Sequence, residues 1–311
     1  MSVDSESFIL FGQKAYSYGL TVAFAALAAL LLFRGIGKRH GYLAGTTRLF
    51  GAMALPMGLI CARALFCLLD SRFRGMFSLR AAGSFWGGGF SMAGVLLGAS
   101  LAAYWTARIA GIYPADVMDV AAAPLLLFVA IARLGEGYTE MLGRSRPLMT
   151  EFLRNSFLAF DTGYGDMLLK TYLLEAATAA YIALALARMA LDGRHRRGDA
   201  FLTGMLLLGC TQVFWESLRF DSHMRWSFVN MQQVLFACML VAPMIVWGRR
   251  CGKAWLWTAI IVCALAIGGA VGLEFMIDRS GFNRLILYAA YAVLMAVPAA
   301  LGLYMRGKCS A

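Results

Sequence analysis

The chain has 311 residues, of which 61% are hydrophobic and only 14% are charged. A soluble domain has about 45–50% apolar and about 25% charged residues, so this composition excludes an ordinary soluble fold. The net charge of +11 does not indicate nucleic-acid binding, because the 28 Lys and Arg residues stand between apolar runs, as they do in membrane-protein loops. We therefore predict an all-α, polytopic integral membrane protein with no nucleic-acid partner.

Apolar runs long enough to cross a bilayer recur along the whole chain. They predict about nine membrane-spanning helices, at about 16–33, 49–69, 85–107, 117–134, 171–191, 201–219, 228–248, 254–277 and 285–304. The N-terminal segment carries Asp4 and Glu6 but no basic leader. We therefore expect the first run to remain as a membrane span rather than to be removed as a signal peptide.

The long loop at about 135–170 mixes apolar and charged residues, including Phe152, Leu153, Phe157, Leu158 and Phe160. This pattern predicts a small outer subdomain with an amphipathic segment at the membrane interface. A poorly ordered loop is the alternative that the composition leaves open.

The densest basic clusters lie at 34–39, 194–197, 249–253 and 306–308. In a chain with nine spans they all fall on one side of the membrane, and such clusters favour the cytoplasm. A simple count of Lys and Arg is more even between the two sides, so the predicted orientation depends on the clusters. The clusters predict an N-terminus outside and a C-terminus in the cytoplasm.

The seven cysteines lie mostly inside apolar runs, without a CxxC pair or a nearby histidine at metal-ligand spacing. We therefore expect no structural metal, no disulfide framework and no cofactor. Of the three histidines, His40 and His195 stand in basic clusters, whereas His223 follows Arg219 on the outer side. For His223, a catalytic role competes with an exposed loop position.

Ionisable side chains in or at the ends of spans are functional candidates, because a charge at the centre of a bilayer costs about 2.5–3.5 kcal/mol. They are Arg63, Arg133, Glu136, Glu140, Glu175, Glu216, Arg219 and Glu274. The predicted topology places all of them in the outer half of the membrane, which indicates one polar cavity open to the outer leaflet. The alternative is local pairing of Arg133 with Glu136 and of Glu216 with Arg219.

Short motifs accompany these charges along the spans. They are Tyr18-Gly19, Ala62-Arg63, Trp86-Gly87-Gly88-Gly89-Phe90-Ser91, Arg133-Leu134-Gly135 through Glu140 to Gly143-Arg144, and Glu216-Ser217-Leu218-Arg219. In order and approximate spacing, they resemble the prolipoprotein diacylglyceryl transferases over roughly residues 8–250. That family is built on seven spans. The resemblance therefore implies a seven-span core at 1–250 and an additional two-span hairpin at 251–311.

Members of that family move the diacylglyceryl group of phosphatidylglycerol to the thiol of a lipobox cysteine in a prolipoprotein. The resemblance implies this activity in a bacterial cytoplasmic membrane, with phosphatidylglycerol or another anionic phospholipid and a prolipoprotein as partners. A cation must hold the phosphate, and a base must take the thiol proton.

The resemblance also implies roles for individual residues. Arg133 and Arg219 would face the phosphate, and Tyr18 would hydrogen-bond the headgroup. The implied substrate-binding set is Tyr18, Arg63, Gly88, Gly89, Arg133, Arg144 and Arg219. The candidate catalytic acids are Glu136, Glu140 and Glu216, and no metal is expected.

Three positions depart from the family pattern: Ala93 replaces an expected histidine, Glu136 an asparagine and Gln212 an arginine. A carboxylate repels phosphate unless it is paired or protonated. Either Glu136 has become the base or the substrate has changed. Two other readings stay open: a non-catalytic relative that binds anionic phospholipid, and a small transporter, which the outer bias of the charges argues against.

Overall fold

A computed structural model describes residues 7–10, 13–42, 44–70, 83, 89–139, 143–148, 150–219, 225–226, 229–279 and 281–310. Gly88, Glu140 and His223 lie outside these residues. Within the described part of the chain, nine helices are long and apolar enough to cross a membrane, which confirms the predicted all-α polytopic architecture.

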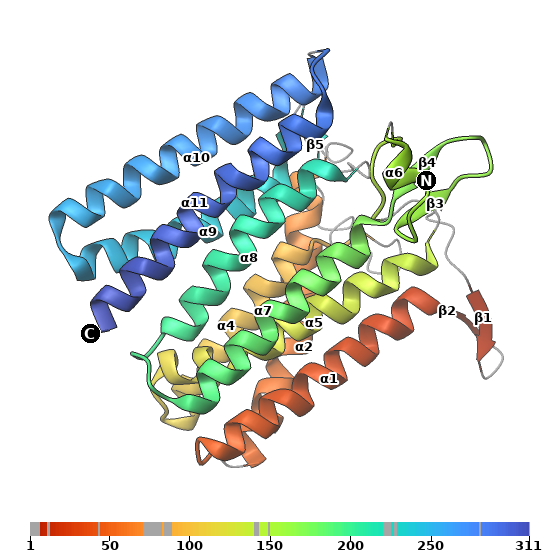
Figure 1. Ribbon diagram of the computed structural model, residues 1–311. Coiled ribbons are helices and arrows are strands. Elements are labelled where there is room, and N and C mark those ends of the chain that lie inside the picture. The colour runs from red at the N-terminus through yellow and green to blue at the C-terminus, as the bar shows by residue number, and fades with distance from the viewer. Residues whose placement is uncertain are drawn as a thin grey trace.

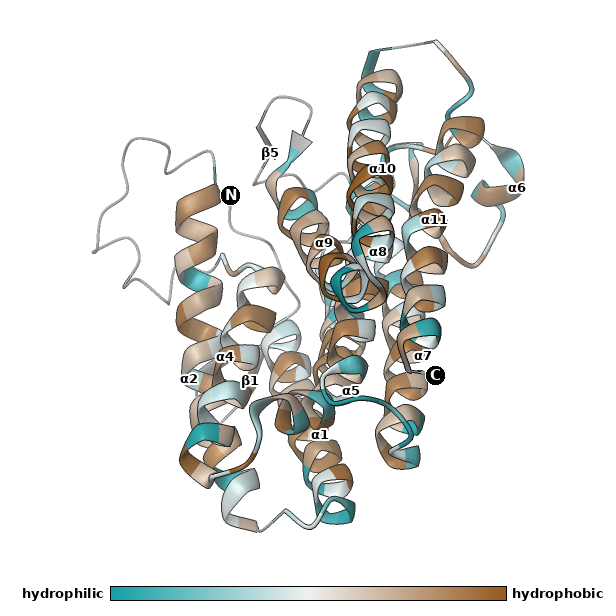
Figure 2. Cartoon of the chain, turned by 90° about the vertical axis from the view of Figure 1, so that its left-hand side faces the viewer, coloured by the Kyte–Doolittle hydropathy of each residue, from teal (hydrophilic) through white to brown (hydrophobic). Residues whose placement is uncertain are grey.

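The long helices run side by side in one bundle (Figure 1). They are α1 (Ser17–Arg39), α2 (Ala44–Leu69), α4 (Met92–Ala110), α5 (Pro114–Gly135), α7 (Thr171–Asp192), α8 (Asp199–Leu218), α9 (Met231–Cys251), α10 (Lys253–Arg279) and α11 (Arg284–Ser310). Several extend beyond the predicted apolar runs, as α1 does to Arg39, because Lys and Arg continue a helix while their head groups reach toward water. Figure 2 shows that the helices are largely hydrophobic along their lengths, as a bilayer requires.

Short elements gather at the end of the bundle away from the C-terminus (Figure 1). The described residues of the 135–170 segment form α6 (Glu151–Arg154) and an antiparallel pair, β3 (Ala159–Asp161) and β4 (Met167–Leu169). We call residues 143–148 and 150–170 the head. Phe152 and Phe157 are 82% and 81% exposed, which gives the head the apolar surface expected of an interfacial segment. Two further antiparallel pairs are β1 (Ser7–Leu10) with β2 (Gln13–Tyr16), and β5 (Arg225–Trp226) with β6 (Val229–Asn230).

Helix α5 occupies the centre of the bundle and packs against α1, α4, α7 and α8. Its small residues Ala121, Ala122 and Ala123 are buried, and they let neighbouring helices approach closely. The helix ends beside the head, so its last turn carries side chains into the interior at that end of the bundle.

The α2–α4 interface depends on Gly94 and Gly98, which are four residues apart on one face of α4. A Cβ atom on either glycine would lie within 3.0 Å of backbone atoms of α2, at Ala62 for Gly94 and at Met57 for Gly98. The two helices therefore touch backbone to backbone, a packing mode typical of small residues at this spacing in membranes.

A disulfide joins Cys251 at the end of α9 to Cys309 near the end of α11, with the Cα atoms 5.7 Å apart. The expectation of no disulfide from the cysteine pattern is therefore wrong at this pair. The two cysteines are 58 residues apart, and only the return of the α10–α11 hairpin to the same end of the bundle brings them together. Sequence spacing carries no signal of such a contact.

The α2–α4 packing generates a stability prediction. We expect Gly98→Ala to lower the free energy of unfolding by about 1–3 kcal/mol, because the added methyl group must displace α2 backbone. Gly268→Ala on α10 is the matched control, since a Cβ there meets nothing within 4 Å and alanine favours a helix over glycine. Thermal unfolding in detergent micelles measures both, and equal midpoints for the two variants would contradict this account of the interface.

Candidate active site

Charged side chains from α5, α7, α8 and the 3-10 turn Glu136–Tyr138 meet inside the bundle near the head. The cluster consists of Arg133, Glu136, Glu175, Glu216 and Arg219, all of them buried. Of the eight ionisable side chains that the sequence places in one cavity, the structure brings these five together, whereas Arg63 bonds to Gly89 and Glu274 to Gln233. We call these five residues the charge cluster.

Arg133 lies at the centre of the charge cluster. Its Nη1 donates to Glu136 Oε1 at 2.6 Å, and its Nε lies 2.8 Å from Glu175 Oε2. Its Nη2 lies 3.4 Å from Glu216 Oε1 and donates to Gln212 Oε1 at 3.1 Å. Nη1 and Nη2 therefore make hydrogen bonds, whereas Nε approaches Glu175 as an ion pair without one. The local pairing of Arg133 with Glu136, which the sequence left open as the alternative, is present.

Arg219 closes the charge cluster from the end of α8. Its Nη1 lies 3.1 Å from Glu136 Oε2 and donates to Glu175 Oε1 at 3.0 Å. Glu136 and Glu175 therefore each bridge both arginines. Glu175, a candidate for the predicted cavity without a specific role, is fully buried and belongs to the same network.

Among the residues that the structure describes, the formal charges of the cluster do not balance, because three carboxylates face two guanidiniums. Buried charges are tolerated when they are paired and hydrogen-bonded, and an excess carboxylate in a low dielectric is a strong acceptor of cations or protons. An anionic ligand can therefore reach either arginine only by displacing a carboxylate.

Gly143 lets the head approach the charge cluster. It has a φ of +67°, and a Cβ there would overlap Glu136 Oε2 and crowd the side chain of Tyr172. The adjacent Arg144 is buried, donates to the carbonyl of Thr139 and stacks 3.9 Å from the ring centre of Phe160 in β3. These contacts hold the start of the head directly over the cluster.

The remaining predicted binding residues lie around this centre. Tyr18 on α1 is next to the end of α5, since a Cβ on Gly135 would lie 3.2 Å from its Cδ2 atom. Arg63 on α2 is buried and donates through Nη1 to the carbonyl of Gly89 at 3.0 Å. Arg63 therefore connects α2 to the backbone that leads into α4.

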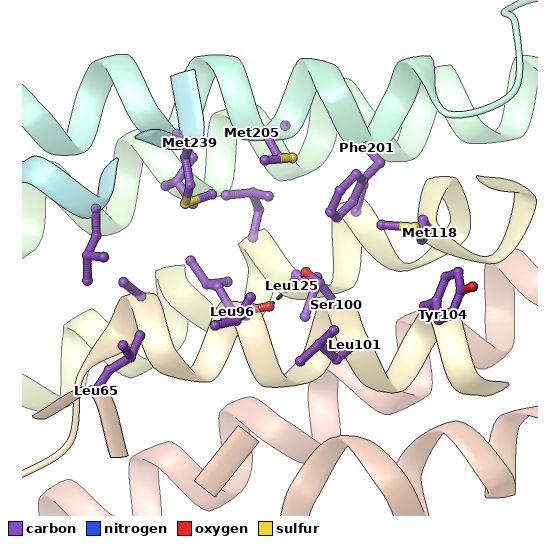
Figure 3. Close-up of a pocket in the computed structure, with 17 residues that line it drawn as sticks. Leu65, Leu96, Ser100, Leu101, Tyr104, Met118, Leu125, Phe201, Met205 and Met239 are labelled. Carbon is purple, nitrogen blue, oxygen red and sulfur yellow. Dashed lines mark hydrogen bonds between the residues drawn. The ribbon is translucent and has the colours of Figure 1, made fainter. Parts of the chain in front are cut away.

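An apolar pocket of about 420 Å³ lies between α4 on one side and α5, α8 and α9 on the other. Figure 3 shows Leu96, Ser100 and Tyr104 strung along α4, facing Phe201 and Met205 of α8 across it. The lining is almost entirely hydrocarbon and thioether, and its volume is that of a typical ligand site.

The charge cluster lies beyond one end of this apolar pocket. On α8, Gln212 follows the lining residue Leu208 by one helical turn, and on α5, Arg133 follows Leu126 by two turns, or about 10 Å. Ala93, which stands where the resemblance expects histidine, is part of the pocket wall. The arrangement places charged groups at the end of an elongated apolar slot, as an amphiphilic ligand requires.

The charge imbalance predicts unequal effects of substitution. Arg133→Leu leaves three buried carboxylates with one arginine, so we expect the free energy of unfolding to fall by about 3–5 kcal/mol. Glu136→Gln leaves two carboxylates with two arginines and keeps an acceptor for Arg133, so we expect a loss below about 1.5 kcal/mol. Chemical unfolding in detergent micelles measures both, and equal losses would show that the imbalance has no energetic consequence.

Comparison with known proteins identifies relatives of similar length. A phosphatidylglycerol–prolipoprotein diacylglyceryl transferase of Geobacillus kaustophilus is 26% identical over 249 residues, covering 77% of this chain and 90% of the relative. Proteins of the same name from Bacillus licheniformis and Bacillus velezensis are 26% and 27% identical, covering 76% and 73% of this chain and 89% and 85% of theirs.

A family model for prolipoprotein diacylglyceryl transferases matches residues 7–249. The matched segment includes the charge cluster and every helix that lines the apolar pocket, and it ends before α10. The chain is an integral membrane transferase that belongs to the prolipoprotein diacylglyceryl transferase family.

Proposed function

We propose that this protein transfers the diacylglyceryl group of phosphatidylglycerol to the thiol of a lipobox cysteine in a prolipoprotein. Relatives over most of the chain carry the name of this activity. The observation that carries the proposal is the position of the charge cluster at the end of the apolar pocket. A lipid with a phosphate headgroup and an acyl chain matches both parts at once.

The pocket would hold one acyl chain, and the bilayer would hold the other. Along α4 the lining runs from Ala93 to Tyr104, a rise of about 16 Å. Burying a hydrocarbon chain against such a wall is favourable by about 25 cal/mol for each Å² of apolar surface removed from water. The glycerol carbons would then lie near Arg133 and Glu136.

The proposed reaction forms one carbon–sulfur bond and breaks one carbon–oxygen bond. The thiolate sulfur attacks the phosphate-bearing carbon of the diacylated glycerol. The bond from this carbon to the phosphate oxygen breaks, and glycerol phosphate leaves with the bonding electron pair. Arg133 and Arg219 would stabilise the charge on the leaving phosphate. The thiol proton would pass to Glu136, whose carboxylate lies beside both arginines.

The paired state of the arginines sets a condition on lipid binding. Arg133 and Arg219 already contact protein carboxylates, so a phosphate must compete with Glu136 or Glu175 for them. A second candidate function is that of a relative that binds anionic phospholipid without transferring it. Ala93 at the expected histidine position supports the same alternative.

A transfer assay on Glu136→Gln separates the two functions. The amide keeps the size and the hydrogen bond but cannot accept the thiol proton, so we expect transfer of labelled diacylglycerol to a lipobox peptide to fall about 100- to 10,000-fold. Binding of phosphatidylglycerol should be retained or tighter, because a negative charge beside the phosphate is gone.

The control for this assay is Glu151→Gln, an exposed carboxylate at the start of α6 in the head. It should leave both transfer and binding unchanged. Wild-type protein that binds phosphatidylglycerol but releases no glycerol phosphate at any pH would overturn the transfer proposal in favour of the binding function.

We further propose that the protein lies in the bacterial cytoplasmic membrane, with the charge cluster and the head on the outer side. The basic residues at 194–197 and 306–308 support this orientation. The Cys251–Cys309 disulfide lies at the end assigned to the cytoplasm, where thiols are normally reduced. The Sγ atom of Cys251 lies 3.4 Å from the carbonyl oxygen of Met305, and that of Cys309 lies 3.6 Å from the carbonyl oxygen of Trp247. In the reduced protein, each thiol has a hydrogen-bond acceptor within reach.

Accessibility labelling tests the orientation. A cysteine introduced at Arg196 in a background without native cysteines should resist membrane-impermeant maleimide in intact cells. A cysteine at Tyr164, which is 95% exposed in the head, should react. The reverse pattern would place the head in the cytoplasm and would agree with a stable Cys251–Cys309 disulfide outside.

A further inference from the structure

The α10–α11 hairpin lies beyond the family match, yet it carries a buried carboxylate toward the site end of the bundle. Glu274 on α10 is only 5% exposed. Tyr291 on α11, which is 1% exposed, lies beside it. A buried carboxylate in a membrane helix is costly unless it is well bonded, so its partners indicate what it is for.

Glu274 bonds directly to the core helix α9. Its Oε1 accepts a hydrogen bond of 2.7 Å from Gln233 Nε2, and the same nitrogen donates to the carbonyl of Val213 on α8 at 3.2 Å. A carboxylate only accepts, so it fixes the orientation of the Gln233 amide, with the nitrogen toward Glu274 and the oxygen away from it.

The fixed amide oxygen of Gln233 then caps α9. It accepts from the backbone N–H of Asn230 at 3.3 Å, while Asn230 Oδ1 accepts from the N–H of Gln232 at 2.9 Å. This is a capping box: the side chain of Asn230, which precedes the helix, bonds to backbone N–H groups of its first turn, and the side chain of Gln233 bonds back to the N–H of Asn230. The position of the Asn230 side chain is thereby determined.

Asn230 transmits this position to the charge cluster. Its Nδ2 donates to Glu216 Oε2 at 3.0 Å, which leaves Glu216 Oε1 to face Arg133 Nη2 at 3.4 Å. A continuous path of buried contacts therefore runs from Glu274 through Gln233, Asn230 and Glu216 to Arg133. Every side chain along it is less than 10% exposed.

A second contact ties the hairpin to the head. Arg146 Nη2 lies 2.5 Å from Asp278 Oδ1, one turn beyond Glu274 on α10. Arg146 follows Ser145, which forms an isolated β-bridge with Arg219. The hairpin thus reaches the charge cluster from two sides, along α9 and through the head.

We propose that Glu274 is a positioning residue for the transfer reaction, which orients Glu216 and Arg133 through Gln233 and Asn230. The additional hairpin is then part of the active machinery rather than a separate membrane anchor. The activity part of this inference rests on the proposed diacylglyceryl transfer, whereas the structural link does not.

The test compares Glu274→Leu, which removes the acceptor, with Glu274→Gln, which keeps one. In Glu274→Leu we expect kcat for transfer from phosphatidylglycerol to a lipobox peptide to fall about 10- to 100-fold, with little change in KM, because the reacting groups are misplaced. Backbone hydrogen exchange at residues 230–233 should quicken roughly fivefold, as expected for loss of a helix cap. Glu274→Gln should stay close to wild type in both measurements.

Ile277→Ala is the matched control, since Ile277 is buried one turn away on the same helix but has no polar side chain. It should lower the unfolding temperature without the specific change in exchange at 230–233 or in kcat. If Ile277→Ala gives the same pattern, or if Glu274→Leu leaves exchange or the kcat of an active enzyme unchanged, the positioning role is overturned. If wild-type protein transfers no lipid but Glu274→Leu still quickens exchange at 230–233, the transfer proposal fails and the link to α9 stands.

Discussion

The pairing of buried charge around Arg133 is the constraint on which the site end of the molecule depends. In an interior of low dielectric an unpaired charge costs several kcal/mol, so Arg133 must keep its carboxylates and the carboxylates must keep their arginines. Those carboxylates come from different elements: Glu136 from the turn after α5, Glu175 from α7 and Glu216 from α8. The charge cluster therefore fixes how three helices meet, and Gly143 is required so that the head can close over it.

The departures from the family pattern have a common physical meaning. Compared with the pattern that the resemblance implies, Gln212 stands at an arginine position and Glu136 at an asparagine position, so this centre has one cation fewer and one anion more. Gln212 uses its oxygen to accept from Arg133 rather than offering a charge to a ligand. These exchanges make the site less suited to holding a phosphate at rest and more suited to accepting a proton. A bound phosphate and the cluster carboxylates therefore compete for the same two arginines.

Much of the membrane architecture follows from the sequence, because the length of an apolar run decides whether the segment can span a bilayer, and this length is visible without knowledge of the fold. The convergence of Arg133, Glu136, Glu175, Glu216 and Arg219 was also predictable, since buried charges in membrane helices usually pair with one another. The separate contacts of Arg63 and Glu274 were not, because nothing local distinguishes a charge that joins the cluster from one that bonds elsewhere. The Cys251–Cys309 pair and the Glu274–Gln233 bond are contacts between distant segments, which neither spacing nor periodicity encodes.

The hairpin shows how a buried polar contact fixes the relative position of two helices more tightly than apolar packing does. Helices in a bilayer associate through van der Waals contact, which tolerates small shifts of one helix along another. A hydrogen bond between buried groups, such as Glu274 with Gln233, fails when its partners separate by about 1 Å, so it fixes the register of α10 against α9. The same register sets Asn230 against Glu216. The two added helices thus constrain the chemistry of the core through a few polar atoms, although most of their surface contacts are apolar.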